Sequence, residues 1–142
     1  MEIIYSSIFQ TISLDTKESL IKVVHSEYSF EMSDEDYKNY ILAYITFIRK
    51  YHPKHFLIND KKLFFTVYPE LQDWVNELFE SIYPLITGNY LALVRSEDFY
   101  VRVSVEQLLE DTKCPLHRAY FDREDEAHQW LMSKAIPQVS VQ

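Results

Sequence analysis

Two histidines and an aspartate near the middle of the chain are the side chains that could together do acid–base or metal chemistry. His52 and His55 stand on either side of Pro53, and Asp60 follows a short apolar run. Converging in a cleft, they could serve a small hydrolase or a metal-dependent enzyme. However, no two of the five histidines have the i, i+4 spacing of a metal pair on a helix. We therefore expect no catalytic residue, no metal site and no cofactor, and keep this enzyme as the alternative hypothesis.

Nucleophilic and nucleotide-dependent chemistry lack their usual signatures. The one cysteine, Cys114, stands next to Pro115, and we interpret it as a packed thiol. No Gly-x-Ser-x-Gly elbow is present to hold a serine beside a histidine. The single glycine, Gly88, falls short of the several that phosphate-binding loops and dinucleotide fingerprints require. The residue types favour binding over catalysis.

The composition is that of a globular protein with an acidic surface. The chain has 142 residues, 47% of them hydrophobic, and a formal net charge of −8. This charge argues against nucleic acid, whose phosphates need clustered lysine and arginine, and favours basic protein partners. No apolar run could span a bilayer, and Glu2 stands where a secretory signal would carry positive charge. We expect a cytoplasmic protein with one domain, residues 1–136, and a short tail, residues 137–142.

Hydrophobic patterning predicts six strands and four helices. The expected strands are Glu2–Ser6, Phe9–Ser13, Leu20–His25, Lys54–Ile58, Tyr90–Val94 and Arg118–Phe121. The helices are expected from Ser33 to Tyr51, from Pro69 to about Pro84, from Ser104 to about Asp111, and after Asp122. The order βββαβαβαβα predicts an α/β fold with one mixed sheet, in which antiparallel N-terminal strands precede parallel βα units. Helices could cover one face of this sheet or both.

The loop from Asn59 to Tyr68 is the first candidate binding site. It leaves the carboxyl end of a strand and approaches a helix N-terminus, where open α/β folds place ligands and partners. Asn59, Asp60, Lys61 and Lys62 open this loop, and the two lysines make it locally basic. A small anion or an acidic protein surface could bind there. The alternative is a solvated loop whose apolar residues enter the core.

The first predicted helix carries the second candidate site. Projected at about 100° per residue, its apolar arc divides into an aliphatic half and an aromatic half. The aromatic half consists of Tyr37, Tyr40, Tyr44, Phe47 and Tyr51. Tyrosine combines a large apolar ring with a hydroxyl that needs a partner. This edge could be the rim of an aromatic core, the face of a homodimer, or the wall of a cavity for an apolar ligand.

Several segments resemble the STAS family, the sulfate-transporter and anti-sigma-factor-antagonist domains, in its bacterial SpoIIAA-like, STAS/SEC14-like branch. The resemblance spans most of the chain and rests on four groups of residues. They are Phe56 to Asp60, Pro69 to Trp74, Gly88 with Tyr90 to Val94, and Phe121-Asp122 with Ala127, Trp130 and Leu131. Membership of this family implies a non-enzymatic binding or switching module.

One functional feature of that family is missing from its usual place. Signalling members carry a phosphorylatable serine or threonine directly after the strand that corresponds to Phe56–Asp60. Here Lys61 and Lys62 follow Asp60, and Thr66 is the nearest hydroxyl that could be phosphorylated. The resemblance therefore implies a regulatory module that recognises a protein partner or a small apolar or anionic ligand. A structural homodimer without a ligand is the other possibility.

Overall fold

Six strands form one mixed sheet in the computed structural model, which describes residues 1–110 and 113–134. The strands are β1 (Glu2–Ser6), β2 (Gln10–Asp15), β3 (Leu20–His25), β4 (His55–Asn59), β5 (Tyr90–Val94) and β6 (His117–Phe121). They lie side by side in the order in which they occur in the chain. Pairing is antiparallel between β1, β2 and β3 and parallel from β3 to β6. The predicted α/β class and mixed sheet are confirmed.

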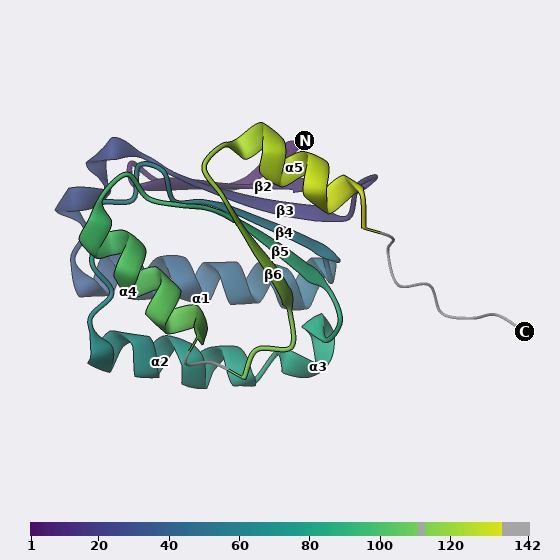
Figure 1. Cartoon of the computed structure of the whole chain (residues 1–142). Coiled ribbons are helices and arrows are strands. Elements are labelled where there is room, and N and C mark those ends of the chain that lie inside the picture. The colour runs from purple at the N-terminus through teal and green to yellow at the C-terminus, as the bar shows by residue number, and fades with distance from the viewer. Residues whose placement is uncertain (111–112, 135–142) are drawn as a thin grey trace, which may run out of the picture.

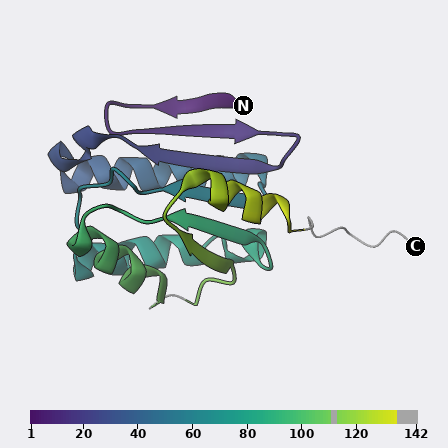
Figure 2. The same ribbon diagram turned by 45° about the horizontal axis from the view of Figure 1, so that its top comes forward.

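The helices divide unequally between the two faces of the sheet. They are η1 (Glu27–Glu31), α1 (Asp34–Tyr51), α2 (Pro69–Glu80), α3 (Tyr83–Ile86), α4 (Phe99–Glu110) and α5 (Glu124–Met132). Figure 1 shows α1, α2 and α4 on one face and α5 on the other, and the turned view of Figure 2 shows the same division. Successive parallel crossovers advance in one direction along the sheet, so the right-handed rule places their helices on one side. We call the two sides the α1 face and the α5 face.

Local sequence signals explain the bounds of α1. The Ser33 side chain accepts a hydrogen bond from the Asp36 backbone N–H, and the Asp36 carboxylate accepts one from the Ser33 N–H. This reciprocal capping box satisfies two N–H groups that a helix start leaves free. At the other end, His52 adopts a left-handed conformation with φ of 49°, and Pro53 follows. The predicted start and end of this helix are confirmed.

Helix α4 begins earlier than predicted. The Asp98 carboxylate accepts a hydrogen bond from the Val101 N–H at 3.1 Å, so the helix is already established before Ser104. Ser104 is buried inside the helix and donates its hydroxyl to the Val101 carbonyl. A serine that bonds back to the preceding turn has the same sequence signature as an N-cap. The predicted helix end at Asp111 lies outside the described residues.

Two other helix boundaries also differ from the predictions. The helix expected from Pro69 to about Pro84 is two helices, because α2 ends at Glu80 and α3 begins at Tyr83. Arg123, not Asp122, is the residue that precedes α5, and its side chain makes no capping hydrogen bond. The predicted tail, residues 137–142, lies outside the described residues. No helix among the described residues is long and apolar enough to cross a membrane.

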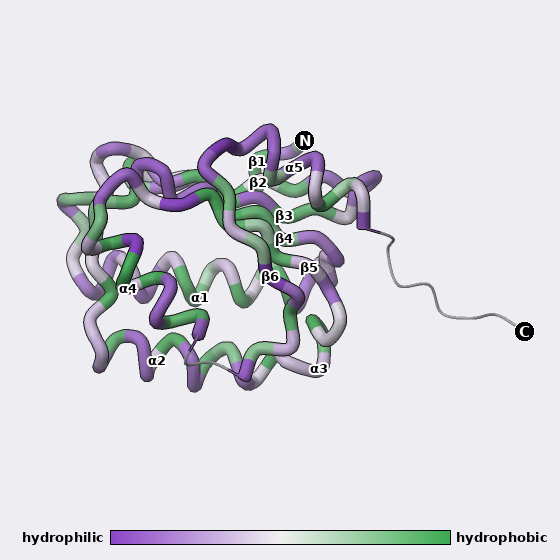
Figure 3. The backbone as a smooth tube through the Cα atoms, viewed as in Figure 1, coloured by the Kyte–Doolittle hydropathy of each residue, from purple (hydrophilic) through white to green (hydrophobic). Residues whose placement is uncertain are grey.

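Alternation along the strands gives the sheet two cores of unequal size. The larger core lies on the α1 face and includes Ile21, Val23, Phe56, Leu91 and Leu93. The smaller core lies on the α5 face and consists of Leu20, Leu57, Ala92, Val94, Ala127 and Leu131. Figure 3 shows that the central strands are predominantly hydrophobic, as expected where helices cover both faces. The sheet therefore buries its middle strands completely.

Candidate functional site

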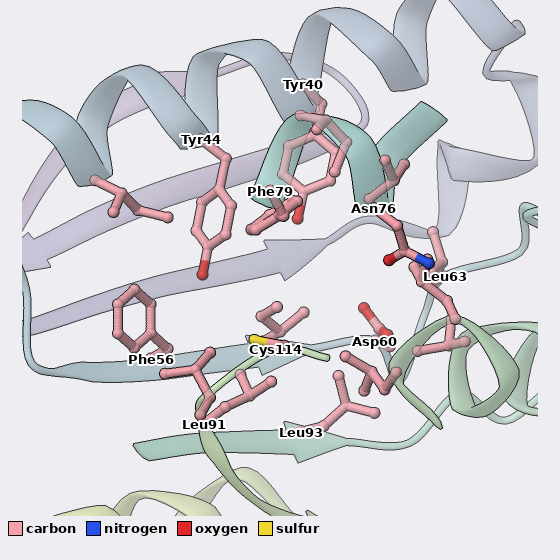
Figure 4. Close-up of a pocket in the computed structure, with 18 of the residues that line it drawn as sticks. Tyr40, Tyr44, Phe56, Asp60, Leu63, Asn76, Phe79, Leu91, Leu93 and Cys114 are labelled. Atoms are coloured by element: carbon pink, nitrogen blue, oxygen red, sulfur yellow. The ribbon is translucent and has the colours of Figure 1, made fainter. Parts of the chain in front are cut away.

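Three tyrosines of α1 extend into the larger core. Tyr37, Tyr40 and Tyr44 follow one another at spacings of three and four residues, so they share one side of the helix, and all three are buried. Figure 4 shows Tyr40 and Tyr44 directed from α1 toward the strands. Their rings pack against neighbouring aromatics, with Tyr37 stacked on Phe65 at 4.9 Å between ring centroids. Three of the five residues of the predicted aromatic edge thus face the interior of their own chain, whereas Phe47 is half-buried and Tyr51 is exposed.

These tyrosines form one wall of a cavity of about 100 Å³. The cavity lies between α1, α2 and α4 and the strands β3, β4 and β5 (Figure 4). Most of its walls are apolar: Ile41, Ile48, Phe56, Ile58, Leu63, Val75, Phe79, Ile86, Leu91, Leu93, Val105, Leu108, Leu109 and Leu116. An engineered apolar cavity of about 150 Å³ takes up benzene, so this space suits a somewhat smaller molecule.

The tyrosine hydroxyls in this wall have no hydrogen-bond partner within the described part of the chain. Burial raises the pKa of Tyr37, Tyr40 and Tyr44 well above the ordinary value of a phenol, and the charge of Asp60 raises each pKa further. All three hydroxyls therefore stay protonated at neutral pH. Each can donate or accept one hydrogen bond to a molecule in the cavity.

A buried histidine and a buried aspartate form the polar corner of the cavity. His25 ends β3 and Asp60 directly follows β4, and the parallel register that pairs Val24 with Asn59 brings them side by side. Each residue is only 3% exposed, and the His25 Nε2 lies 3.3 Å from the Asp60 Oδ1. The Tyr40 ring meets the His25 ring edge-on at 5.1 Å between centroids. The other ring nitrogen, Nδ1 of His25, is buried without a hydrogen-bond partner among the described residues.

The four residues predicted to form a contact loop point in different directions. Asn59 donates to the Glu124 carboxylate at 3.0 Å on the α5 face, whereas Asp60 enters the cavity. Lys61 and Lys62 are exposed, and the Lys62 Nζ lies 3.2 Å from the Glu97 carboxylate. Only the two lysines are therefore available to a protein partner. Asp60 lines the cavity, and Asn59 binds Glu124 on the α5 face.

Two further predicted residues lie away from the cavity. Phe47 is half-buried against Tyr5, with 6.4 Å between ring centroids. Thr66, the candidate phosphosite, is exposed at a shallow groove that also contains Tyr68, Phe99 and Tyr100. Because Tyr37, Tyr40 and Tyr44 are buried within the chain, a homodimer would have to use another surface.

The structure does not bring His52, His55 and Asp60 together. His52 is exposed, whereas His55 is buried with Nδ1 2.8 Å from the Glu18 carbonyl oxygen and Nε2 3.3 Å from the Lys134 carbonyl oxygen. His55 starts β4 and Asp60 follows its end, roughly 16 Å away by the rise of a strand. No group of three metal-ligating side chains occurs within residues 1–110 and 113–134. The convergence that the enzyme hypothesis needs is absent for these three residues.

The residue that sequence reasoning missed is His25. It stands two residues after Val23 and four after Ile21, so it shares their buried face of β3. Asp60 continues the same alternation after Phe56 and Ile58 on β4. This period of two, combined with the parallel pairing of β3 and β4, was the available signal for a polar pair in the core.

Comparisons with known proteins found no relative of this chain. No family model, no curated protein and no solved structure matches it. The six-stranded sheet and its order of elements are nevertheless consistent with a STAS-like fold. The topology therefore supports the resemblance at the level of the fold.

Proposed function

We propose that this chain is a binding module that takes up a small, largely apolar molecule in the cavity beneath α1. The observation that carries the proposal is the combination of an apolar cavity of about 100 Å³ with three unpartnered tyrosine hydroxyls in its wall. Ligand pockets of proteins combine mostly apolar walls with a few polar groups that orient the ligand. Tyr37, Tyr40 and Tyr44 are such groups.

The energetics of buried hydroxyls favour an occupied cavity. A buried polar group that loses its hydrogen-bond partner costs roughly 1–3 kcal/mol. With nothing in the cavity, each of the three hydroxyls would carry such a cost, in a domain whose stability is about 5–15 kcal/mol. A ligand that hydrogen-bonds to one or more hydroxyls relieves this penalty. The apolar walls favour a ligand with an apolar body over a cluster of waters, each of which needs two to four polar partners.

The position of Asp60 supports a regulatory role. This residue borders the cavity and also opens the loop that carries the exposed Lys61 and Lys62. A ligand that contacts Asp60 would bias the loop, and a protein partner at the lysines would sense the change. In this proposal the chain is a cytoplasmic, non-enzymatic STAS/SEC14-like module. No chemical step is assigned to it.

Native mass spectrometry of the protein purified from its own host tests the proposal. We expect an excess mass that disappears when the same sample is denatured. The Tyr44→Phe variant keeps the ring and removes one hydroxyl, so it should retain less of that mass. A protein that carries no cargo, and whose cavity holds only water in a high-resolution crystal structure, would refute ligand binding.

Exposed aromatic side chains favour protein binding as a second candidate function. Phe99 and Tyr100 are 65% and 75% exposed and contact each other at 5.7 Å between ring centroids. They follow Glu97, whose N–H donates to the Lys61 carbonyl, so the aromatic pair and the basic loop belong to one surface. Aromatic residues surrounded by charges are typical of protein interfaces.

The double variant Lys61→Glu/Lys62→Glu tests this second function. A partner recovered by the wild-type protein should be lost by the variant, while the fold measured by circular dichroism stays the same. The matched control is Lys17→Glu/Lys54→Glu, which changes the charge equally at other sites. Equal capture by all three proteins would exclude the loop as the contact.

A further inference from the structure

We infer that the ligand of this cavity is a small primary amine, and that its ammonium group pairs with the Asp60 carboxylate. The inference rests on the proposed function and names the class of molecule that the cavity takes up. It is carried by the carboxylate of Asp60, which is buried, borders the cavity and receives no hydrogen bond from the described part of the chain.

The Asp60 carboxylate lacks the partners that a buried charge needs. Its side chain is 5% exposed, and no N–H or O–H group of the described residues donates a hydrogen bond to it. Within the same part of the chain, His25 is the one basic side chain at ion-pair distance, with Nε2 3.3 Å from Oδ1 and no hydrogen bond between them. Buried charges in proteins are usually paired and hydrogen-bonded. A cation in the cavity would supply what the chain leaves out.

The carboxylate of Asp60 is accessible from the cavity. Among the described residues, two buried side-chain atoms are both unpaired and completely enclosed, Nδ1 of His25 and Nε of Arg95. The Asp60 oxygens are not among these enclosed atoms although no hydrogen bond reaches them, so they keep accessible surface in the cavity wall. Figure 4 shows the carboxylate directed from the strands toward α1 and α2. A molecule in the cavity can therefore reach this charge.

Other groups of the cavity wall also suit an ammonium ion. The Tyr40 hydroxyl and the Asn76 side-chain oxygen can each accept a hydrogen bond, and neither has a partner among the described residues. An ammonium group has three N–H donors and no acceptor, so it can serve Asp60 and further acceptors together. The rings of Tyr44 and Phe79 line the same space, and aromatic faces attract cations. An anion would instead be repelled by the carboxylate.

The volume limits the alkyl group of this amine. With about 100 Å³ of space, against about 150 Å³ for a cavity that binds benzene, the ligand has roughly four to six non-hydrogen atoms. Its carbon atoms would contact Phe56, Leu91 and Leu93, which border the cavity in Figure 4. A short branched alkylamine such as isobutylamine has this size and polarity.

Isobutylammonium and isobutanol form a matched pair of probes for the experiment. They share one skeleton of non-hydrogen atoms, but only the ammonium carries a charge. Titration of the full-length protein with each probe at equal ionic strength, followed by NMR, should give an affinity for isobutylammonium at least about tenfold higher, equivalent to about 1.4 kcal/mol. The carboxyl carbon signal of Asp60 should shift with isobutylammonium and stay in place with isobutanol. Cross-peaks from the probe methyls to Leu91 and Leu93 should place the probe in the cavity.

The Asp60→Asn variant removes the charge and keeps the shape of the side chain. It should lose the preference for isobutylammonium, so that isobutanol binds at least as tightly. The matched control is Asp73→Asn, which changes the net charge equally at an exposed position of α2. This control should keep the preference. A preference that Asp73→Asn also loses would mean that the overall acidity of the protein attracts the amine, and would overturn the role of Asp60.

The failures of the inference and of the proposed function are distinguishable. Isobutanol that binds wild-type protein as tightly as isobutylammonium, or an unchanged preference in folded Asp60→Asn, would overturn the pairing with Asp60 while leaving ligand binding intact. Cargo in native mass spectra without binding of isobutylammonium would do the same. Neither probe binding, together with no cargo, would overturn both. Should Asp60→Asn fail to fold, the two affinities and the Asp60 carboxyl signal of the wild-type protein still decide the matter.

Discussion

The two faces of the sheet each bury a histidine, and they satisfy its ring differently. On the α5 face, both ring nitrogens of His55 contact backbone carbonyl oxygens, those of Glu18 and Lys134. On the α1 face, His25 contacts Asp60 through one nitrogen and leaves the other without a partner among the described residues. A histidine that ties chain segments together needs no ligand. On the α1 face, one polar atom of the histidine is instead enclosed without a partner among the described residues.

The packing of the two faces follows the same division. The α5 face has a small aliphatic core with one helix across it, whereas the α1 face has three longer helices around a cavity. The buried tyrosines of the described residues all lie on the α1 face. The comparison teaches that the α5 face is closed by apolar packing, whereas the α1 face combines the larger core with polar groups that lack partners among the described residues. Each prediction below tests this difference by changing the pH or a residue on one of the two faces.

Alkaline pH should have the largest effect on stability, and it should act through the tyrosines of the α1 face. Burial raises the pKa of Tyr37, Tyr40 and Tyr44 in the folded chain above the ordinary value of 10.0. Below pH 10 each is protonated in both states, so stability is unaffected. Above pH 10 only the unfolded chain releases these protons, so stability falls by up to about 1.4 kcal/mol per pH unit for each tyrosine. Circular dichroism should report one cooperative transition, and the phenolate absorbance of these three tyrosines should appear with it.

The Tyr44→Phe variant is the control for alkaline unfolding. It removes one of the three ionisations, so its stability should fall less steeply above pH 10. The difference in phenolate absorbance between the wild-type protein and Tyr44→Phe isolates this tyrosine from the others of the chain. A difference that develops well before the loss of circular dichroism would show that Tyr44 ionises in the folded protein, and would contradict the prediction.

Breaking the polar pair should have the next largest effect on stability. The His25→Leu variant leaves the buried Asp60 carboxylate without its neighbour, which should cost about 3–5 kcal/mol in urea unfolding. The double variant His25→Leu/Asp60→Leu should recover most of this loss, because apolar residues often replace a buried pair without penalty. A double variant that is less stable than the single one would show that the pair stabilises the fold.

The corresponding change on the α5 face should affect stability alone. His55→Leu leaves the carbonyl oxygens of Glu18 and Lys134 without their contacts, which should cost about 1–3 kcal/mol. Its excess mass in native mass spectra should equal that of the wild-type protein. A changed excess mass would mean that the two faces are coupled through β4.

Filling the cavity should have the smallest effect on stability. Unlike the preceding variants, it should stabilise the protein. Val75→Ile adds one methylene at a buried position of the cavity wall and should stabilise the empty protein by about 0.5–1 kcal/mol. The same change should reduce the excess mass that the protein carries in native mass spectra, because it occupies part of the space. Thermal unfolding measures the gain in stability, and a variant that retains more of the excess mass would contradict the assigned position.

Most of the fold was predictable because local signals determine it. Ser33 with Asp36 and His52 with Pro53 delimit α1 in the sequence as they do in the structure. The start of α4 was not predictable in the same way, because Ser104 resembles a cap and its bond to Val101 is visible only in three dimensions. Local chemistry can support two interpretations where a hydroxyl has a choice of backbone partners.

The candidate site was predictable only in part. The division of the α1 residues by chemistry singled out Tyr37, Tyr40 and Tyr44, and a cavity wall was one of the three interpretations left open. The pairing of His25 with Asp60 depends on the register between two strands that are separated by α1. Sequence spacing does not contain this register, so the polar corner became visible only with the sheet.

The sequential order of the strands also has a consequence for how the chain folds. Each strand pairs with the strand before it in the chain, so the sheet can grow from β1 to β6 without pairing strands that are distant in the order of synthesis. Helix α5 follows all six strands in the described part of the chain and covers Leu20, Leu57 and Ala92, which belong to earlier strands. A nascent chain therefore exposes one apolar side of the sheet until α5 emerges from the ribosome. During that interval a chaperone would have a flat aliphatic surface to bind, and truncation before α5 would leave that surface open to aggregation.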